Sequence, residues 1–266
     1  MPNPYEALYA PVPDVDLYLK RIGCEKESVL SREYLDRLVW GHLSHVPFEN
    51  LDVCEKGMIP SLNTEDLFNK IVVRRRGGYC FEQNGLFQKF LCGLGFDAYC
   101  VAVRIMGRSD GWLPPVRHRG VVVNIGDERF YCDVGFGGAC PVSAVKIDDG
   151  KEWQQSGSRQ YKGYVSGKDI HIDMLDGGVE SHLFFFRDEP TDEIDFTAPN
   201  CAVSADPESH FRTARIVSVL KDNGSGYVSL NGNIFKEKTG DVITEKELSS
   251  DKEFFDHAEK YFGIVL

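Results

Sequence analysis

The sequence predicts an α+β protein, in which helices and strands occupy separate stretches of the chain. Three observations support this class. Apolar residues recur at helical spacings from residue 14 to about 95, alternate with a period of two from about 96 to 240, and return to helical spacing near the C-terminus. The chain has 266 residues, enough for one to three compact domains with a buried core.

The N-terminal third is expected to form a small helical bundle. Ser31 is a suitable cap for one helix, and residues 63–64 open another. A further helix should begin near residues 78–80 and end at Gly93 or Gly95, because glycine commonly terminates helices.

The middle of the chain is expected to consist of strands. β-branched and aromatic runs occur at 121–123, 183–186 and 216–220, separated by turns that contain glycine. The Asn-Gly pairs at 223–224 and 231–232 predict hairpin turns.

The C-terminal segment predicts a final helix. Ser250 and Glu253 have the spacing of a capping box, and Gly263 can end the helix. Between them, Phe254, His257, Ala258 and Tyr261 fall on one face of the helix.

The charge balance restricts the partners of the protein. Thirty basic side chains stand against forty-one acidic ones, giving a formal net charge of −11. Such a chain does not attract nucleic acid or anionic membranes as a whole. No apolar run approaches the roughly 18 to 20 residues that cross a bilayer, and the start of the sequence lacks the pattern of a secretory signal. We therefore expect a cytoplasmic protein that acts on a small molecule, with no nucleic-acid or membrane partner.

The chain contains eight cysteines, at positions 24, 54, 80, 92, 100, 132, 140 and 201. No two of them form a C-x-x-C pair, so a structural zinc site is disfavoured and no metal is expected. In a cytosolic protein these cysteines should be reduced thiols.

One of these cysteines stands in a setting that favours nucleophilic chemistry. Arg74 to Arg76 and two glycines precede Cys80 at the expected start of a helix. The positive end of the helix dipole and free backbone N–H groups favour a thiolate there, and the glycines let a substrate approach the sulfur. A cysteine beside a glycine turn is usually a buried structural residue, but the basic run and the helix start favour a nucleophile at Cys80.

His118 and Asp133 flank a predicted hairpin. If its turn is centred between residues 125 and 126, His118 lies directly opposite Asp133. Opposed side chains on antiparallel strands have β-carbons about 4.5–5.5 Å apart, so a carboxylate can hold an imidazole there. The second ring nitrogen is then free to take a proton from the Cys80 thiol. These three residues are the predicted catalytic residues; the alternative is that His118 and Asp133 form a strand-edge pair without a catalytic role.

These segments resemble the arylamine N-acetyltransferase family of acetyl-CoA-dependent enzymes. The resemblance rests on RGGYCFEQN at 76–84, on His118 followed by three valines at 121–123, and on DVGFG at 133–137. It extends to VPFENL at 46–51 and, later in the chain, to Asn200, Ser204, Ser209 and Phe211. The run from Asp133 to the expected strand at 184–186 is short and lacks the longer insertion that vertebrate members have after the barrel. In this respect the chain resembles the bacterial members of the family.

The resemblance implies three domains around a cysteine-protease-like catalytic core. A helical bundle at residues 1–95 would carry the nucleophile, and a β-barrel at 96–200 would carry the histidine and the aspartate. An α/β lid with a C-terminal helix would occupy residues 201–266.

The resemblance also implies an activity and further site residues. A cysteine thioester would carry acetyl from acetyl-CoA to arylamines, arylhydrazines or arylhydroxylamines by a ping-pong mechanism, as in xenobiotic metabolism. Phe48 and Phe136 would line the acceptor pocket, the alternative being that both are ordinary core aromatics, while Gly137 and Gly138 would contact coenzyme A. Arg117 stands where many members have a small hydroxylated residue before the histidine. We expect Arg117 to contact coenzyme A as well.

Arginines around the proposed site could form a local positive mouth for the coenzyme. Eight fall within 56 residues, namely Arg74, Arg75, Arg76, Arg104, Arg108, Arg117, Arg119 and Arg129. We expect at least one of the first three to form a structural ion pair, and expect Arg108 and Arg129 to be solvated.

Five of the six other histidines show no metal-binding spacing. His42, His45, His182, His210 and His257 lack an i, i+4 or H-E-x-x-H arrangement. His210, next to Phe211, is the best candidate among them for an outer pocket wall.

Other functions remain open at this stage. A related amide synthase would use the same three residues on a longer or tethered acyl thioester, and a hydrolase of the protease or transglutaminase type shares the Cys-His-Asp order. A pure binding module would need no reactive thiol.

Overall fold

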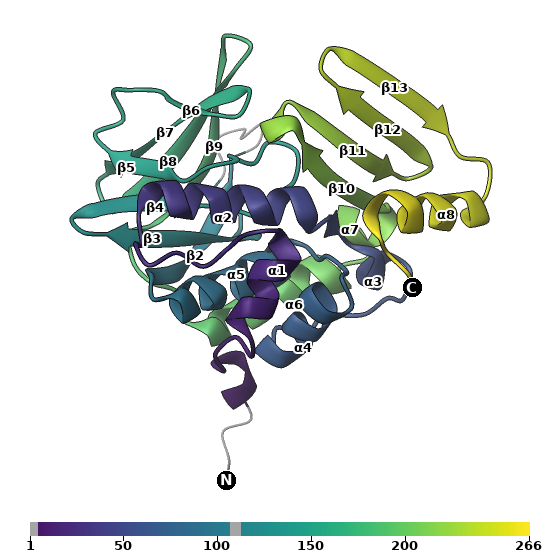
Figure 1. The fold of residues 1–266 in the computed structure, drawn as a ribbon, viewed down its shortest axis with the longest axis horizontal. Coiled ribbons are helices and arrows are strands. Elements are labelled where there is room, and N and C mark those ends of the chain that lie inside the picture. The colour runs from purple at the N-terminus through teal and green to yellow at the C-terminus, as the bar shows by residue number, and fades with distance from the viewer. Residues whose placement is uncertain (1–4, 107–112) are drawn as a thin grey trace.

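The computed structural model describes residues 5–106 and 113–266 and confirms the α+β class (Figure 1). The helices are α1 (Val15–Ile22), α2 (Arg32–His45), α3 (Leu51–Cys54), α4 (Thr64–Phe68), α5 (Cys80–Leu94), α6 (Thr197–Ala205), α7 (His210–Thr213) and α8 (Asp251–Phe262), with short helical turns η1 (Glu6–Leu8), η2 (Asn69–Val73), η3 (Glu193–Phe196) and η4 (Asp222–Gly224). The strands are β1 (Phe48–Glu49), β2 (Asp97–Ile105), β3 (His118–Ile125), β4 (Glu128–Cys132), β5 (Val145–Asp148), β6 (Gln154–Ser156), β7 (Arg159–Ser166), β8 (Asp169–Asp176), β9 (Val179–Arg187), β10 (Ile216–Lys221), β11 (Gly226–Asn231), β12 (Ile234–Thr239) and β13 (Val242–Glu247).

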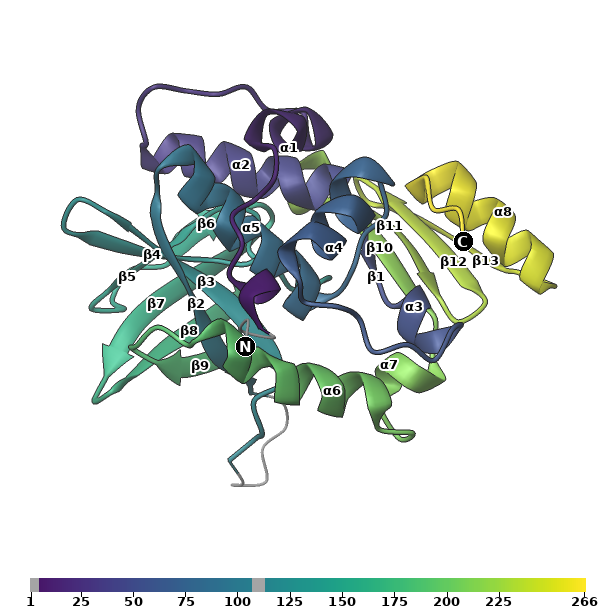
Figure 2. The same cartoon turned by 90° about the horizontal axis from the view of Figure 1, so that it is seen from below.

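Helix α5 is the centre of the N-terminal region (Figure 2). It contacts α1, α4 and the barrel strands β2 and β3, and its residues Phe87 and Phe90 are fully buried. Burial on nearly every side explains why this helix is rich in apolar residues all round. The expected helix ends are confirmed: the Ser31 side chain accepts from the Tyr34 N–H, and Gly95 ends α5 in the left-handed conformation.

Seven strands close into a barrel in the middle of the chain. The order β5-β4-β3-β2-β9-β8-β7 is antiparallel throughout, and a parallel pairing of β5 with β7 completes the ring; β6 pairs with β7 outside it. Gly163 permits this closure, because a β-carbon there would lie 2.9 Å from the Lys146 carbonyl oxygen. The barrel predicted from the family resemblance is therefore present.

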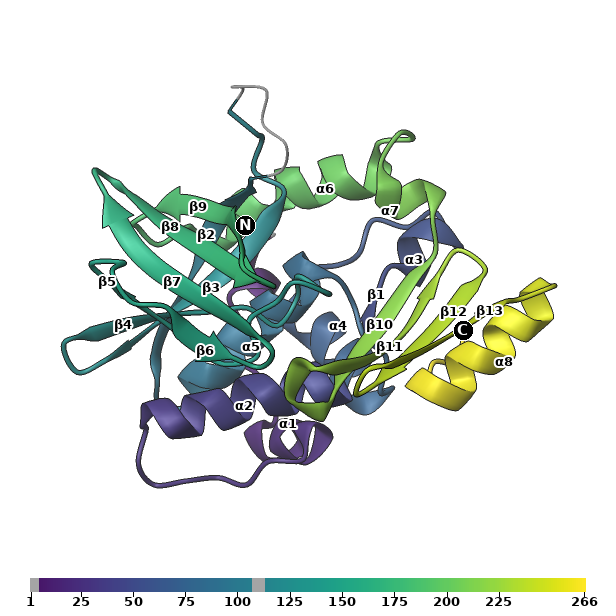
Figure 3. The same cartoon turned by 90° about the horizontal axis from the view of Figure 1, so that it is seen from above.

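A second sheet packs beside the barrel, in the order β1-β10-β11-β12-β13, with α8 along it (Figure 3). Its first strand comes from the N-terminal region, because Phe48 pairs with Ser218 of β10. Phe254 and Phe262 on α8 are buried against this sheet. Strand β1 thereby links the helical region to the C-terminal sheet.

The strand pattern expected between 96 and 240 is interrupted by helices α6 and α7. The expectation missed them because α6 is short and Pro199 lies in its first turn, where proline is tolerated. Ser209 caps α7, its hydroxyl accepting from the Phe211 N–H. The division of the chain at residues 95 and 200 stays a prediction. Among the described residues, no helix has both the length and the apolar character that crossing a membrane requires.

Candidate active site

Cys80 is the first residue of α5 and is buried. The Tyr79 N–H donates to the Glu82 carboxylate at 3.1 Å, which fixes the chain at its entry to the helix. The preceding loop is tightly packed, since a β-carbon on Gly77 would lie 1.8 Å from the Pro47 carbonyl oxygen. The helix start and the close glycine turn agree with the expectation from the sequence.

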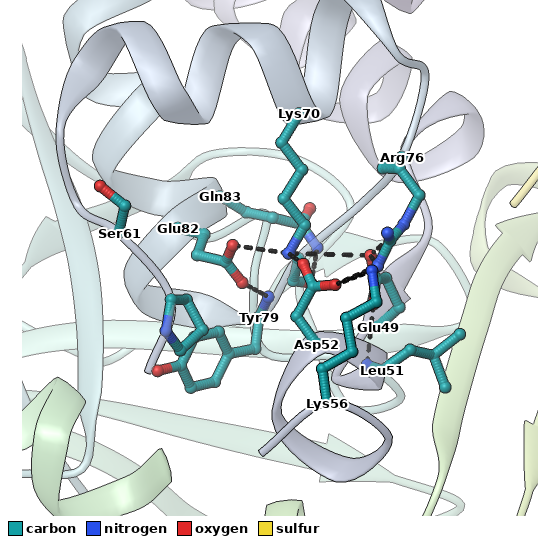
Figure 4. A network of polar contacts seen from close by, with 12 residues as sticks. Glu49, Leu51, Asp52, Lys56, Ser61, Lys70, Arg76, Tyr79, Glu82 and Gln83 are labelled. Atoms are coloured by element: carbon teal, nitrogen blue, oxygen red, sulfur yellow. Dashed lines mark hydrogen bonds and ion pairs between the residues drawn. The ribbon is translucent and has the colours of Figure 1, made fainter. Parts of the chain in front are cut away.

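A charge network surrounds this helix start (Figure 4), made of Glu49, Asp52, Lys70, Arg76 and Glu82. Lys70 Nζ lies 2.7 Å from Glu82 and 2.8 Å from Asp52. Arg76 lies 2.7 Å from Glu49, which confirms the expected structural ion pair beside the cysteine. Burial raises the pKa of Glu82, although the neighbouring Lys70 charge opposes this. The network therefore keeps buried carboxylates paired with cations at the start of α5.

His118 begins β3, and Asp133 directly follows β4. The register pairs Ile125 with Glu128, so the turn consists of residues 126–127 and the predicted register was wrong by two residues. A shift of two keeps every side chain on its original face of the hairpin. His118 and Asp133 consequently still meet.

The three predicted catalytic residues lie together. His118 Nε2 lies 2.5 Å from Asp133 Oδ2, and both side chains are buried. Cys80 and His118 line the same cavity, and the Cys80 side chain acts on the pKa of this imidazole. Since Nε2 faces the carboxylate, Nδ1 is the ring nitrogen left for the sulfur.

Asp133 is held by more than the histidine. The Tyr131 hydroxyl donates to Oδ2 at 2.8 Å, while Oδ1 accepts from Asn84 Nδ2 at 2.9 Å and from the Gly135 N–H at 3.0 Å. All four donors stabilise the ionised carboxylate. Burial alone would raise the pKa of Asp133, but the His118 charge and these hydrogen bonds hold it below its usual value.

The electrostatics favour a protonated histidine. Burial lowers the pKa of His118, but the Asp133 and Cys80 charges, together with hydrogen bonds to both, raise it to about 10. An imidazolium beside the sulfur stabilises a thiolate, the nucleophilic form of cysteine.

The sulfur opens onto a cavity of about 520 Å³ between the barrel, the helix start and the α6–α7 segment. Its lining combines aromatic, small apolar and charged residues: Phe48, Cys80, Ile105, Arg117, His118, Gly135, Phe136, Ala202, Val203, Asp206, Glu208, Ser209, His210 and Phe211. Both predicted pocket aromatics, Phe48 and Phe136, are among them, as is His210. The space suits a small aromatic molecule next to the thiol.

The predicted coenzyme residues lie in different places. Arg117 is exposed on the cavity lining. Gly137 and Gly138 are absent from the described lining, although a β-carbon on Gly137 would come within 3.9 Å of the Phe48 ring. Arg119 is buried and ion-paired with Glu193, so it does not contribute to a positive mouth.

Two further arginines, Arg108 and Arg129, were expected to be solvated. Arg129 forms an ion pair with Asp188 rather than standing alone in solvent. Arg108 lies outside the described residues.

The sequence reasoning missed Asn84, Tyr131 and Phe184. Asn84 lies one helical turn after Cys80 and bonds Asp133, while Phe184 stacks on the His118 ring with centroids 5.3 Å apart. The i, i+4 spacing from the cysteine could have identified Asn84, and the i, i−2 spacing from the aspartate could have identified Tyr131. Phe184 comes from a distant strand and left no local signal.

The arrangement of the cysteines and of the other potential metal ligands tests the expectations about metals and disulfides. Within residues 5–106 and 113–266, no group of three or more His, Cys, Asp or Glu side chains is arranged to hold a metal ion. All eight cysteines lie in these ranges as free thiols.

Comparison with known proteins gives a consistent result. Residues 32–266 match the family model described as N-acetyltransferase. An arylamine N-acetyltransferase from Mycolicibacterium smegmatis is 36% identical over 257 residues, which cover 95% of this chain and 92% of the relative. One from Escherichia coli is 26% identical, with 95% and 89% coverage.

Solved structures agree with the sequence matches. The arylamine N-acetyltransferase from Salmonella typhimurium superposes with a TM-score of 0.87 at 26% identity, covering 96% of this chain and 92% of the other. A Mycobacterium marinum arylamine N-acetyltransferase solved in complex with CoA has a TM-score of 0.85 at 27% identity, with 94% and 93% coverage.

Proposed function

The chain belongs to the arylamine N-acetyltransferase family, and from this premise we propose that it moves acetyl from acetyl-CoA to aromatic amines through a thioester on Cys80. The single observation that carries the proposal is the buried pair of His118 and Asp133 beside Cys80, at the wall of an aromatic cavity that both Cys80 and His118 line.

In the first half-reaction, the Cys80 thiolate attacks the acetyl carbonyl of acetyl-CoA and coenzyme A leaves as a thiol. The His118 imidazolium supplies the proton that the departing sulfur needs. Exchange between two thioesters is nearly balanced in free energy, so transfer of the acetyl group to the enzyme has no large thermodynamic cost.

In the second half-reaction, an arylamine, arylhydrazine or arylhydroxylamine attacks the acetyl-cysteine. His118, now neutral, accepts a proton from the attacking nitrogen, and the Cys80 thiolate leaves. An amide is more stable than a thioester, so this step drives the cycle forward. One enzyme intermediate between two substrates gives ping-pong kinetics.

The cavity supports an aromatic acceptor. Phe48, Phe136 and Phe211 offer flat apolar walls around the sulfur, which favour aryl rings by stacking and by burial of apolar area. We assign Arg117 and the backbone at 137–138 to coenzyme A, because a guanidinium pairs with phosphate and glycine backbone permits close approach. A cytoplasmic location and a role in xenobiotic metabolism belong to the same proposal.

Intact-mass measurement after mixing with acetyl-CoA tests the proposal. We expect an acetyl-sized increase in the parent protein and none in Cys80→Ala, whose folding is checked by circular dichroism. Adding a neutral arylamine should discharge the adduct much faster than water does. An adduct that water removes equally fast would favour the hydrolase alternative, and no adduct in a single turnover would contradict the proposal.

A further inference from the structure

Two histidines face outward from neighbouring barrel strands, outside the candidate active site. His171 on β8 lies between Ile170 and Ile172, which are buried in the barrel core. Because side chains alternate along a strand, His171 lies on the outer face. His182 on β9 pairs with Asp173 just after a register shift in this ladder. This irregularity brings the two imidazole rings to a centroid distance of 4.9 Å.

A carboxylate determines the tautomer of one ring. His182 Nδ1 hydrogen-bonds to Asp173 Oδ1. An ionised carboxylate only accepts, so Nδ1 of His182 carries the proton and its Nε2 presents a lone pair. That Nε2 lies 3.0 Å from Nδ1 of His171. Metal-binding histidines commonly donate their second nitrogen to a carboxylate in this way.

The neighbouring aromatic rings hold His171 in place. Tyr164 on β7 and Phe185 on β9 are its cross-strand partners. Both stack on the imidazole, with centroid distances of 5.3 Å and 5.8 Å. Nδ1 of His171 and Nε2 of His182 are therefore held in position before any ligand arrives. This lowers the entropy cost of binding.

We propose that His171 and His182 form a two-histidine site for a divalent first-row transition-metal ion of the nickel(II) or copper(II) class. On binding, the proton on His171 Nδ1 moves to Nε2 by exchange with water, so lone pairs of both rings face the ion. The ion gives up two water ligands, and its oxidation state does not change.

The spacing of the nitrogens selects the class of ion. Metal–imidazole bonds of about 2.0–2.1 Å joined to nitrogens 3.0 Å apart give an N–metal–N angle of about 94°. This is close to the right angle between adjacent ligands in octahedral or tetragonal sites, and it is narrower than the tetrahedral angle that zinc prefers.

The surroundings supply charge but no further protein ligand. Asp173 neutralises part of the cation charge through His182, while Lys162, with its Nζ 3.7 Å from Asp173 Oδ2, opposes it. Water completes the coordination, because no third described side chain joins the two nitrogens.

Calorimetric titration with nickel chloride tests this site, using the full chain with accessible thiols alkylated by iodoacetamide so that cysteines do not compete. We expect one saturable equivalent in the parent protein. His171→Ala and His182→Ala should each weaken binding by about tenfold or more, and Asp173→Asn should weaken it by about tenfold through the lost orientation of His182.

His257→Ala is the matched control, because this partly buried histidine on α8 has no second imidazole in contact. It should bind nickel as the parent does. Copper(II) added to the same alkylated proteins should give an electron paramagnetic resonance spectrum with coupling to two imidazole nitrogens, reduced to one in either single variant. Absence of saturable nickel binding in the parent, or unchanged binding in both histidine variants, would overturn the proposal.

Discussion

The Tyr131 hydroxyl donates to Asp133 Oδ2, the same oxygen that binds His118. The ring of Tyr131 fits because Gly120 has no side chain: a β-carbon there would lie 2.5 Å from Tyr131 Cε2. The Tyr131 hydroxyl and the His118 imidazole therefore compete for hydrogen bonding to the same carboxylate oxygen. Tyr131 therefore limits how strongly Asp133 raises the proton affinity of His118.

Replacing Tyr131 by Phe should raise the pKa of His118, because Asp133 Oδ2 then serves the imidazole alone. The measurement is an NMR titration of the His118 ring. Tyr161→Phe is the matched control, since its buried hydroxyl donates to the Ala139 carbonyl instead. Equal midpoints in both variants would show that Tyr131 does not act on the histidine.

The raised pKa of His118 also predicts how stability depends on pH. Between pH 6.5 and about 10 the folded protein keeps a proton on His118 that the unfolded chain releases, so its contribution to stability is complete below pH 6.5 and is lost as the pH rises through 10. The free energy of unfolding should fall by up to about 1.4 kcal/mol per pH unit in this window. Denaturant unfolding of His118→Gln should lack this slope; an identical slope would assign it to other groups.

Gly135→Ala should disrupt the site. An added β-carbon would lie 2.7 Å from the Cys80 α-carbon and 3.3 Å from Asn84 Nδ2, and neither the helix nor the aspartate loop can move away cheaply. We expect a lower melting temperature and slower alkylation of Cys80 by iodoacetamide. Gly138→Ala, in the same loop with no atom within 4 Å of the new β-carbon, should match the parent in both measurements.

Lys70→Met should destabilise the protein by about 3–5 kcal/mol, because it leaves buried carboxylates with too few cations. Lys70 is 13% exposed and contacts Glu82, Asp52 and Glu49. Lys56→Met provides the comparison, since this 42% exposed lysine contacts Asp52 alone and should cost less than about 1 kcal/mol. Urea unfolding measures both, and similar losses would contradict a special role for Lys70.

Local features of the site were predictable from the sequence. The start of α5 at Cys80 depends on residues within one turn, namely the glycines before it and Glu82 after it. The meeting of His118 with Asp133 was predictable although the register was wrong, because a two-residue error preserves the face on which each side chain lies.

The residues around Cys80, His118 and Asp133 were harder to predict from the sequence. Arg117 and Arg119 look alike in sequence, yet one is exposed and the other is buried against Glu193 from a distant turn. The cross-strand pair of His171 and His182 depends on a register irregularity that no spacing rule reveals.

The amino-acid sequence by itself determined the class of fold, the position of Cys80 at the start of a helix and the hairpin face shared by His118 and Asp133. Tertiary structure decided which distant side chains complete the site, such as Phe48, Phe184 and Phe211, and how the barrel closes. The physical reason is range: caps, turns and alternation act between neighbours in the chain, whereas burial and ion pairing depend on segments that only folding brings together.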